Sequence, residues 1–337
     1  MKSFFRIVFL LMWYSPLVAQ DIQYSQFYAA PLFLNPAFTG SEENTRVGVN
    51  YRNQWPGLSH SFHAYSAYFD HFLEGSNSSV GMLVNGSRES LAQVSNMEVG
   101  ALYSYRLRLG EYQFLNFGGQ ISYVSRNAAF EDLVFGSQID IDRGTVDGSM
   151  PDLPYGDRQH HYADINFGML WNSKNLWLGA SAHHLTRPHF SYIDDTNNRL
   201  SIRYGVHGGV RLDLTGGFIN DYFNNTLQER AMFFAFNYKS QDPFNQLDVG
   251  GQIFFEPLLL GIWYRGLPVS YSLPNHESII LLVGFALKNG MDIGYSFDVT
   301  TSKLGLKNSG GAHELSFRYS FYKGDPYKRK WRLLPFF

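Results

Sequence analysis

The chain has 337 residues, a formal net charge of −2 at pH 7 and no cysteine. A charge so close to zero gives no electrostatic basis for nucleic-acid binding, and the lack of cysteine excludes a lipoprotein anchor, disulfides, thiolate metal sites and a cysteine nucleophile. Aromatic residues make up 17% of the chain and there are 32 glycines, while the mean hydropathy is mildly polar, a combination typical of membrane β-barrels, in which only alternate residues face lipid.

Residues 1–19 have the form of a secretory signal peptide. Lys2 and Arg6 supply the basic start, residues 7–14 supply the apolar run, and Ala19 is a small residue suited to cleavage. The apolar run is too short to span a bilayer as an anchor helix, and no later run reaches that length. We therefore expect the chain to be exported.

Residues 20–43 predict an irregular segment. The stretch AAPLFLNPAFTG, residues 29–40, contains Pro31 and Pro36. Proline breaks helix interiors and is confined to the edges of sheets. Because prolines also fix the backbone shape in advance, we expect this segment to pack permanently, as a plug or brace.

Period-two alternation recurs across residues 44–323, as in 291–300, where apolar and small or charged residues alternate. It predicts fourteen strands, an even number, as a single-chain outer-membrane barrel requires. The fold class is therefore all-β, an antiparallel up-and-down transmembrane barrel whose lumen we expect to hold the N-terminal segment. The strands are predicted near 44–55, 61–72, 79–89, 93–109, 112–126, 160–172, 175–185, 199–213, 229–239, 245–256, 258–265, 276–288, 290–301 and 312–323.

The predicted connections alternate in length, as in outer-membrane barrels with short periplasmic turns and long external loops. Odd strands precede long loops such as 127–159, which carries five more acids than bases. The pattern has exceptions: 214–228 is long on the short side, and 56–60 and 240–244 are short on the long side. A basic tail, residues 324–337, then lies on the periplasmic side; its cations include Lys328, Arg329, Lys330 and Arg332.

A secreted β-sandwich is the alternative fold. Many aromatic residues near strand ends favour the barrel, where such residues form girdles at the membrane interfaces. The residues assigned to these girdles are Trp55, Trp171, Trp177, Trp263, Tyr319 and Tyr322.

Inward positions of the first and last two strands carry charges that barrel closure would bring together. Buried charges must be paired, so these residues predict a structural ion-pair ladder in the lumen or, alternatively, a selectivity device. They are Arg46, Arg52, Asp292, Asp298, Glu314 and Arg318.

The sequence offers no motif for catalysis. The pairs at 160–161 and 183–184 are adjacent histidines, and neighbours on a strand face opposite sides, so we expect neither pair to chelate a metal. The stretch 140–144 lacks the glycine spacing and closing glutamate of a calcium loop. We expect no enzymatic activity, no cofactor and no metal.

Three groups of residues form motifs along the chain. The first-strand motif is Tyr51, Arg52, Gln54 and Trp55, and the last-loop motif includes Gly310, Gly311, His313 and Glu314. The opening motif consists of Gln20, Asp21, Tyr24, Ser25, Gln26, Pro31, Leu32, Asn35, Pro36, Ala37 and Gly40. Together these motifs resemble those of the PorP/SprF family of outer-membrane proteins associated with the type IX secretion system of Bacteroidota. The opening departs from the family in one place, since Ala30 stands where the family has its first Asn before Pro31.

The resemblance implies a fourteen-stranded barrel without enzymatic activity. Its role would be secretion or surface attachment of a cognate type IX cargo protein, such as a gliding adhesin, with an OmpA-like peptidoglycan-binding protein as a periplasmic partner. A passive channel or transporter for hydrophobic or small solutes, with the N-terminal segment as its hatch, is the alternative. Inward glycines at 48, 118, 168, 205, 209, 250, 261 and 294 would leave room for that segment.

Overall fold

The structure, a computed structural model, describes residues 21–90, 93–128, 139–140, 145–146, 159–189, 199–214, 230–266, 277–302 and 304–321. The predicted signal peptide, the basic tail with its four named cations, Tyr322 and most of the acidic loop lie outside these residues. None of the described helices is long and apolar enough to cross a bilayer.

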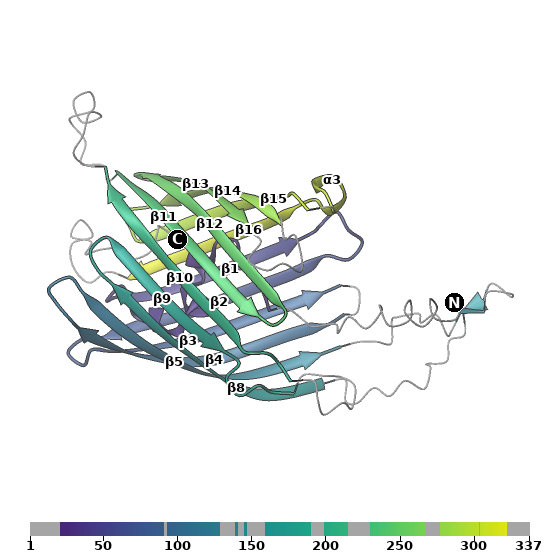
Figure 1. Cartoon of the computed structure of the whole chain (residues 1–337), viewed down its shortest axis with the longest axis horizontal. Coiled ribbons are helices and arrows are strands. Elements are labelled where there is room, and N and C mark those ends of the chain that lie inside the picture. The colour runs from purple at the N-terminus through teal and green to yellow at the C-terminus, as the bar shows by residue number, and fades with distance from the viewer. Residues whose placement is uncertain are drawn as a thin grey trace, which may run out of the picture.

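Fourteen antiparallel strands form a closed barrel in which neighbours in sequence are neighbours in the sheet (Figure 1). The first and last strands complete the ring, from Thr45 opposite Phe321 to Gln54 opposite Ala312. This confirms the predicted barrel and excludes the sandwich. The strands are β1 Thr45–Gln54, β2 Phe62–Leu73, β3 Ser78–Glu89, β4 Ser95–Arg108, β5 Phe114–Asn127, β8 Gln159–Asn172, β9 Leu176–His183, β10 Arg203–Asp213, β11 Arg230–Gln241, β12 Phe244–Phe255, β13 Leu258–Arg265, β14 Ser278–Ala286, β15 Met291–Thr300 and β16 Ala312–Phe321, with a separate pair, β6 Ile139–Asp140 and β7 Thr145–Val146.

The wall has an apolar outer face and a polar inner face. In β15, Ile293 and Tyr295 are exposed on the outside, whereas Asp292, Ser296 and Asp298 are buried on the inside. Closure leaves no strand edge, so the ladder satisfies the backbone polar groups that lipid cannot. An apolar exterior with a closed ladder is what a hydrocarbon environment requires.

The two rims of the barrel differ. Brief connections, including 74–77, 173–175 and 256–257, follow β2, β8 and β12 at the rim we call the short-turn end. The opposite rim, the long-loop end, carries the connection 301–311 with helix α3, Leu306–Ser309, which stops at Gly310 in the left-handed conformation (φ 69°). Two exceptions to the predicted pattern of connection lengths are present in the structure. The connection 214–229 is long although it follows β10 at the short-turn end, and only residues 242–243 join β11 to β12 at the long-loop end.

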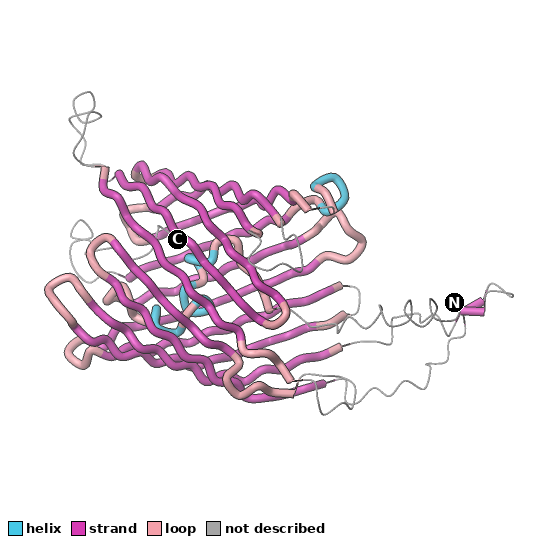
Figure 2. The backbone as a smooth tube through the Cα atoms, in the orientation of Figure 1, coloured by secondary structure: helices cyan, strands magenta, loops and turns pink. Residues whose placement is uncertain are grey.

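Residues 21–43, which we call the plug, lie inside the barrel as short helical turns (Figure 2). Pro31 and Pro36 stand at first helical positions, where proline needs no amide partner. The Asn35 side chain accepts a hydrogen bond from the amide of Ala37 at 2.8 Å and so caps the last turn. The proline spacing thus divides the segment into turns, which are η1 Phe27–Ala29, α2 Pro31–Leu34 and η2 Pro36–Phe38.

The girdle prediction was wrong for two tryptophans. Trp177 and Trp263 are 5% and 2% exposed. They face the plug, with ring centroids 5.8 Å from Phe38 and 5.2 Å from Phe27, respectively. Small residues on the strands between the two tryptophans explain this inward direction, because an indole can occupy the space beside a glycine on the neighbouring strand. In register, the row runs Trp177, Gly209, Ala235, Gly250, Trp263.

Candidate functional site: a plugged lumen

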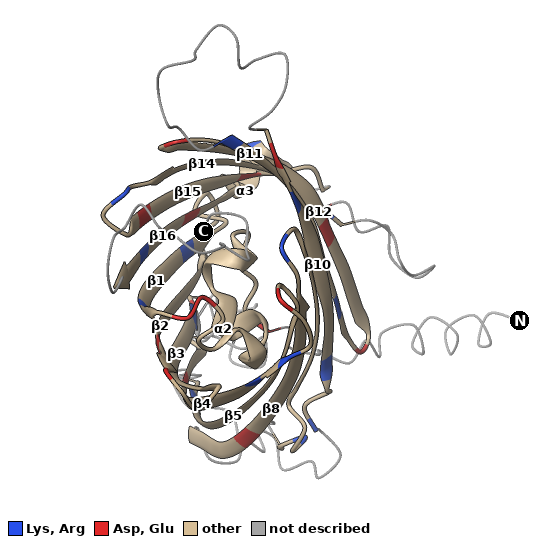
Figure 3. Cartoon of the chain, turned by 90° about the vertical axis from the view of Figure 1, so that its left-hand side faces the viewer, with Lys and Arg blue, Asp and Glu red and all other residues tan. Residues whose placement is uncertain are grey.

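The plug lies within the ring of strands (Figure 3). At the long-loop end, Asp21 contacts Arg203 at the start of β10. Towards the short-turn end, the amide of Gly40 donates to Asp70 of β2 at 2.6 Å, and the chain then enters β1. Residue 21, the first that the structure describes, therefore lies at the rim with the long loops.

The three sequence motifs meet at Glu314. Its carboxylate accepts the backbone amides of Ser25 at 2.6 Å and Gln26 at 3.0 Å. The guanidinium of Arg52 lies 3.3 Å from the same carboxylate and 2.8 Å from Asp298. Ser25 joins these groups, since its hydroxyl donates to Asp298 at 2.6 Å and accepts from Arg52 at 2.5 Å. Charge-assisted hydrogen bonds of this kind are stronger than neutral ones, so this cluster fixes the start of the plug.

Gln26 extends the contact along β16. Its side-chain amide donates to the carbonyl of Glu314 at 3.1 Å, and its oxygen accepts from Ser316 at 2.7 Å. The motif Tyr-Ser-Gln therefore contributes one glutamine that pairs with the last strand. Tyr24 is buried against the ring of Phe33, at a centroid distance of 5.4 Å.

A second charge cluster lies nearer the short-turn end. Arg46 contacts Asp70 at 2.6 Å and Glu42 of the plug at 3.0 Å. Arg318 pairs with Asp292 and reaches the same Glu42 oxygen at 3.1 Å. Glu42 therefore links the first and last strands at their seam.

All six residues of the predicted ladder are buried and take part in ion pairs. Sequence reasoning missed the plug's own Glu42 and the inward carboxylate Asp70. It also missed Arg265, which contacts Asp248 at 2.9 Å and the carbonyl of Tyr24 at 3.1 Å. Alternation along β2 could have found Asp70, but no local pattern marks Glu42, because it precedes the first strand.

On the opposite side, Asn35 attaches the plug to β8 and β9. Its amide nitrogen donates to the carbonyls of Met169 at 3.0 Å and Ala180 at 3.1 Å. Gly168 permits this approach, since a Cβ there would lie 1.8 Å from the Asn35 side-chain oxygen. Gly118 similarly faces the backbone of Pro36 and Ala37.

The expectation that all the inward glycines leave room for the plug was too broad. A Cβ on Gly48, Gly209 or Gly250 would instead meet Tyr68, Trp177 or Trp263, which are side chains of the wall itself. Glycine therefore serves two purposes here, because some positions admit the plug and others admit large inward residues.

The N-terminal end of the plug is held by an ionic anchor. The ring nitrogens of His184 lie 2.7 Å from Asp21 and 2.6 Å from Asp164, and Arg203 lies 3.0 Å from Asp21. Burial alone would lower the pKa of His184, but the two carboxylates outweigh it and raise this pKa to about 9. His184 is therefore cationic at neutral pH.

His183 and His184 act separately, because His184 follows the end of β9 with φ at 61°. The His183 ring nitrogen instead lies 3.3 Å from the carbonyl oxygen of Leu34. Within the described ranges, no group of three or more His, Asp or Glu is placed to hold a metal.

Other motif residues face outwards or shape the rim. Tyr51 is 45% exposed on the outer wall, with its hydroxyl 2.9 Å from His63. The Trp55 amide donates to the carbonyl of Gly311 at 2.8 Å. The first-strand motif thus also joins the connection that follows β1 to the connection that precedes β16. Pro31 and Leu32 are buried in α2, and the Gln54 side-chain oxygen accepts a hydrogen bond from Arg52 at 3.4 Å. Gly310 and Gly311 both have positive φ, at 69° and 73°. The His313 ring lies 2.8 Å from the hydroxyl of Tyr295.

Towards the long-loop end, the plug leaves a cavity of about 270 Å³, which we call the vestibule. Ile22 and Phe33 of the plug line it, together with strands β2 to β5, β8 and β9. The side-chain oxygens of Asn85 and Gln120 are buried in this lining without a hydrogen-bond partner.

Over residues 17–319, the chain matches the family model described as Type IX secretion system membrane protein PorP/SprF. The chain belongs to the PorP/SprF family. The resemblance seen in the three motifs is therefore confirmed. Four of the motif residues, Ser25, Gln26, Arg52 and Glu314, join the plug to the seam of the barrel. Family membership and the apolar closed wall place this PorP/SprF protein in the outer membrane.

Solved barrels with related form have very different sequences. Outer membrane protein Omp33 from Acinetobacter baumannii is 9% identical (TM-score 0.41), covering 84% of this chain and 100% of that one. A Pseudomonas aeruginosa FadL homologue is 11% identical (TM-score 0.42; 87% and 94% covered), and the Pseudomonas putida toluene transporter TodX is 9% identical (TM-score 0.43; 90% and 94% covered). At such scores, we infer nothing about function from them. The search of curated proteins found no match.

Proposed function

We propose that this PorP/SprF protein is a non-enzymatic barrel that supports secretion or surface attachment of one cognate type IX cargo protein, such as a gliding adhesin. The observation that carries the proposal is the family match across residues 17–319. The plug supports it, because a lumen crossed by a chain with ion pairs at several levels suits a scaffold better than an open pore.

The barrel offers a separate surface to each partner. At the long-loop end, the vestibule and loops would receive the cargo. At the other end, the short turns and the basic tail, residues 324–337, would meet an OmpA-like peptidoglycan-binding partner. Asn35, Pro36 and Ala37 are buried against the wall, which favours their role as a brace over contact with the cargo.

Deletion of the gene tests this proposal. We expect one surface protein to be lost from the cells while other type IX cargo is still exported, as read by mass spectrometry of surface and culture fractions. Loss of every cargo would make the protein a general component of the export machinery, and an unchanged surface would refute the cargo role.

A solute transporter makes a different prediction. Liposomes that contain the pure protein would then take up small or hydrophobic solutes without any partner. We expect no uptake above that of liposomes containing a heat-denatured sample.

A further inference from the structure

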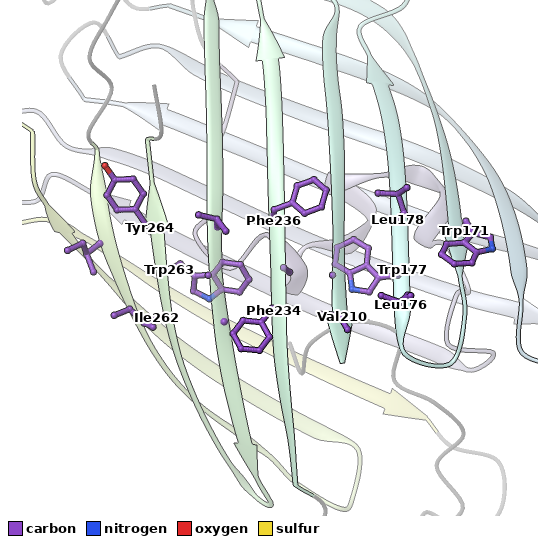
Figure 4. Close-up of a pocket in the computed structure, with 16 residues that line it drawn as sticks. Trp171, Leu176, Trp177, Leu178, Val210, Phe234, Phe236, Ile262, Trp263 and Tyr264 are labelled. Carbon is purple, nitrogen blue, oxygen red and sulfur yellow. The ribbon is translucent and has the colours of Figure 1, made fainter. Parts of the chain in front are cut away.

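The outer wall has an apolar depression over β9 to β13 that the lumen and its plug do not explain. It has a volume of about 870 Å³, within the range of roughly 300 to 1,000 Å³ typical of ligand sites. Figure 4 shows its lining, where Leu178, Phe234, Phe236 and Ile262 surround it on the outer side. We call it the wall depression.

The register explains why the wall is hollow here. Gly251 lies between Phe234 and Ile262 on adjoining strands and points outwards with them. An outward glycine between large apolar side chains leaves space in the outer face, and Gly251 is among the residues that line the depression.

The barrel wall beneath the wall depression is thin, because the neighbouring inward-facing residues are small. Gly209, Ala235 and Gly250 stand side by side on β10, β11 and β12. Beyond them lie the indoles of Trp177 and Trp263, which also line the wall depression. The same indoles pack against the plug, so one aromatic layer separates this recess from the plug.

The position and chemistry of the recess identify its occupant. Phe234 lies near the middle of β11 and Ile262 near the middle of β13, which places this part of the recess at the depth of the hydrocarbon layer. No charged side chain is among its lining residues. A recess without contents would cost its lining the dispersion contacts of close packing, and the molecules around it in a bilayer are lipid chains.

We propose that the wall depression binds an acyl chain of an outer-membrane lipid, seated over Gly251 and in contact with the indoles of Trp177 and Trp263. The headgroup stays at the membrane interface, because the lining of the recess has no charged side chain to pair with it. The site depends only on the barrel and lipid, so it holds whichever cargo the protein serves.

Brominated lipid tests this site, because bromine quenches tryptophan fluorescence only at short range. In the full-length mature chain, Trp55, Trp171 and Trp331 are replaced by Phe, so that only the two tryptophans beneath the wall depression remain. The protein is reconstituted in phosphatidylcholine vesicles with dibrominated stearoyl chains and in matched oleoyl vesicles. We expect the brominated chains to reduce the emission at least twofold.

A filling substitution shows whether the quenching arises in the wall depression. Ile262→Phe enlarges an outward side chain at its edge and should restore at least half of the lost emission. The matched control is Ile121→Phe on β5, also outward and exposed (66%, against 59% for Ile262), which should leave the quenching unchanged.

Equal emission in the two kinds of vesicle would overturn the proposal, including the case in which a second copy or another protein covers the recess. Quenching that Ile262→Phe and Ile121→Phe leave equally unchanged would also overturn it, because the lipid would then act from outside the wall depression.

Discussion

The plug meets two walls of different chemistry. Towards β1, β2, β15 and β16 it is held by carboxylates and guanidinium groups, with Glu314 and Asp70 each bound to its backbone. Towards β9 and β13 it packs against two indoles. Directed contacts fix where the plug sits, since each works in one geometry, whereas apolar packing adds stability through buried area without fixing the position.

The difference also appears outside the barrel. The wall with the ion pairs includes the seam between the first and last strands, where the register must bring Arg52 opposite Glu314. The wall with the indoles is thin enough at its glycines to form the wall depression. Ion pairs at the seam and aromatic packing on β9 and β13 thus hold the same plug from different parts of the ring.

Removing the plug should have the largest effect, because both walls lose their partner at once. Deletion of residues 23–40 is expected to raise single-channel ion conductance in planar bilayers, since the water-filled lumen would then be continuous. Full-length protein is the control. An unchanged conductance would refute the view that this segment obstructs the lumen.

Truncation on the indole wall comes next. Trp263→Ala should cost about 3–5 kcal/mol of unfolding free energy, the range for large aromatic residues in packed cores. Urea unfolding in lipid vesicles, followed by tryptophan emission, measures it. Trp171→Ala, an outward and half-buried tryptophan, should cost much less, and equal losses would contradict the inward packing of Trp263.

On the charged wall, Glu314→Gln should have a smaller effect. It keeps the size of the side chain but removes the charge that pairs with Arg52, at a cost of roughly 1.5–3 kcal/mol. Cleavage of the plug by added protease should accelerate accordingly, while Glu111→Gln, at an exposed turn, should match the unaltered protein. If Glu314→Gln resists cleavage equally well, the motif cluster does not hold the plug.

The anchor at His184 should give the smallest effect and a pH dependence. The pKa of His184 is raised from its ordinary 6.5 to about 9, so its pairing stabilises the folded anchor fully below about pH 6.5, and this is lost as pH rises through about 9. Because the chain has no other cysteine, a nitroxide on Gln23→Cys reports the motion of the plug's end. Its mobility should increase above pH 9.

The same label gives the control for that measurement. In the His184→Gln background, the nitroxide at position 23 should be mobile already at pH 7 and should change little with pH. A label whose mobility rises identically in both backgrounds would show that the anchor does not depend on this histidine.

The sequence by itself determined the strands and their number, because alternate residues face lipid and lumen and so leave a period of two. It also determined that the N-terminal segment forms no long helix and no strand, because Pro31 and Pro36 interrupt both. The inward direction of Arg46, Arg52 and Glu314 followed from the same alternation.

Only the tertiary structure decided which groups meet. Contacts such as Ser25 with Glu314 join residues 289 positions apart, and their pairing depends on the register at the seam, which no local pattern records. The direction of Trp177 and Trp263 also had to come from the fold. β9 and β13 carry large apolar residues on both faces, so alternation there no longer distinguishes lipid from lumen, and the plug supplies the apolar surface that lets an indole face inwards.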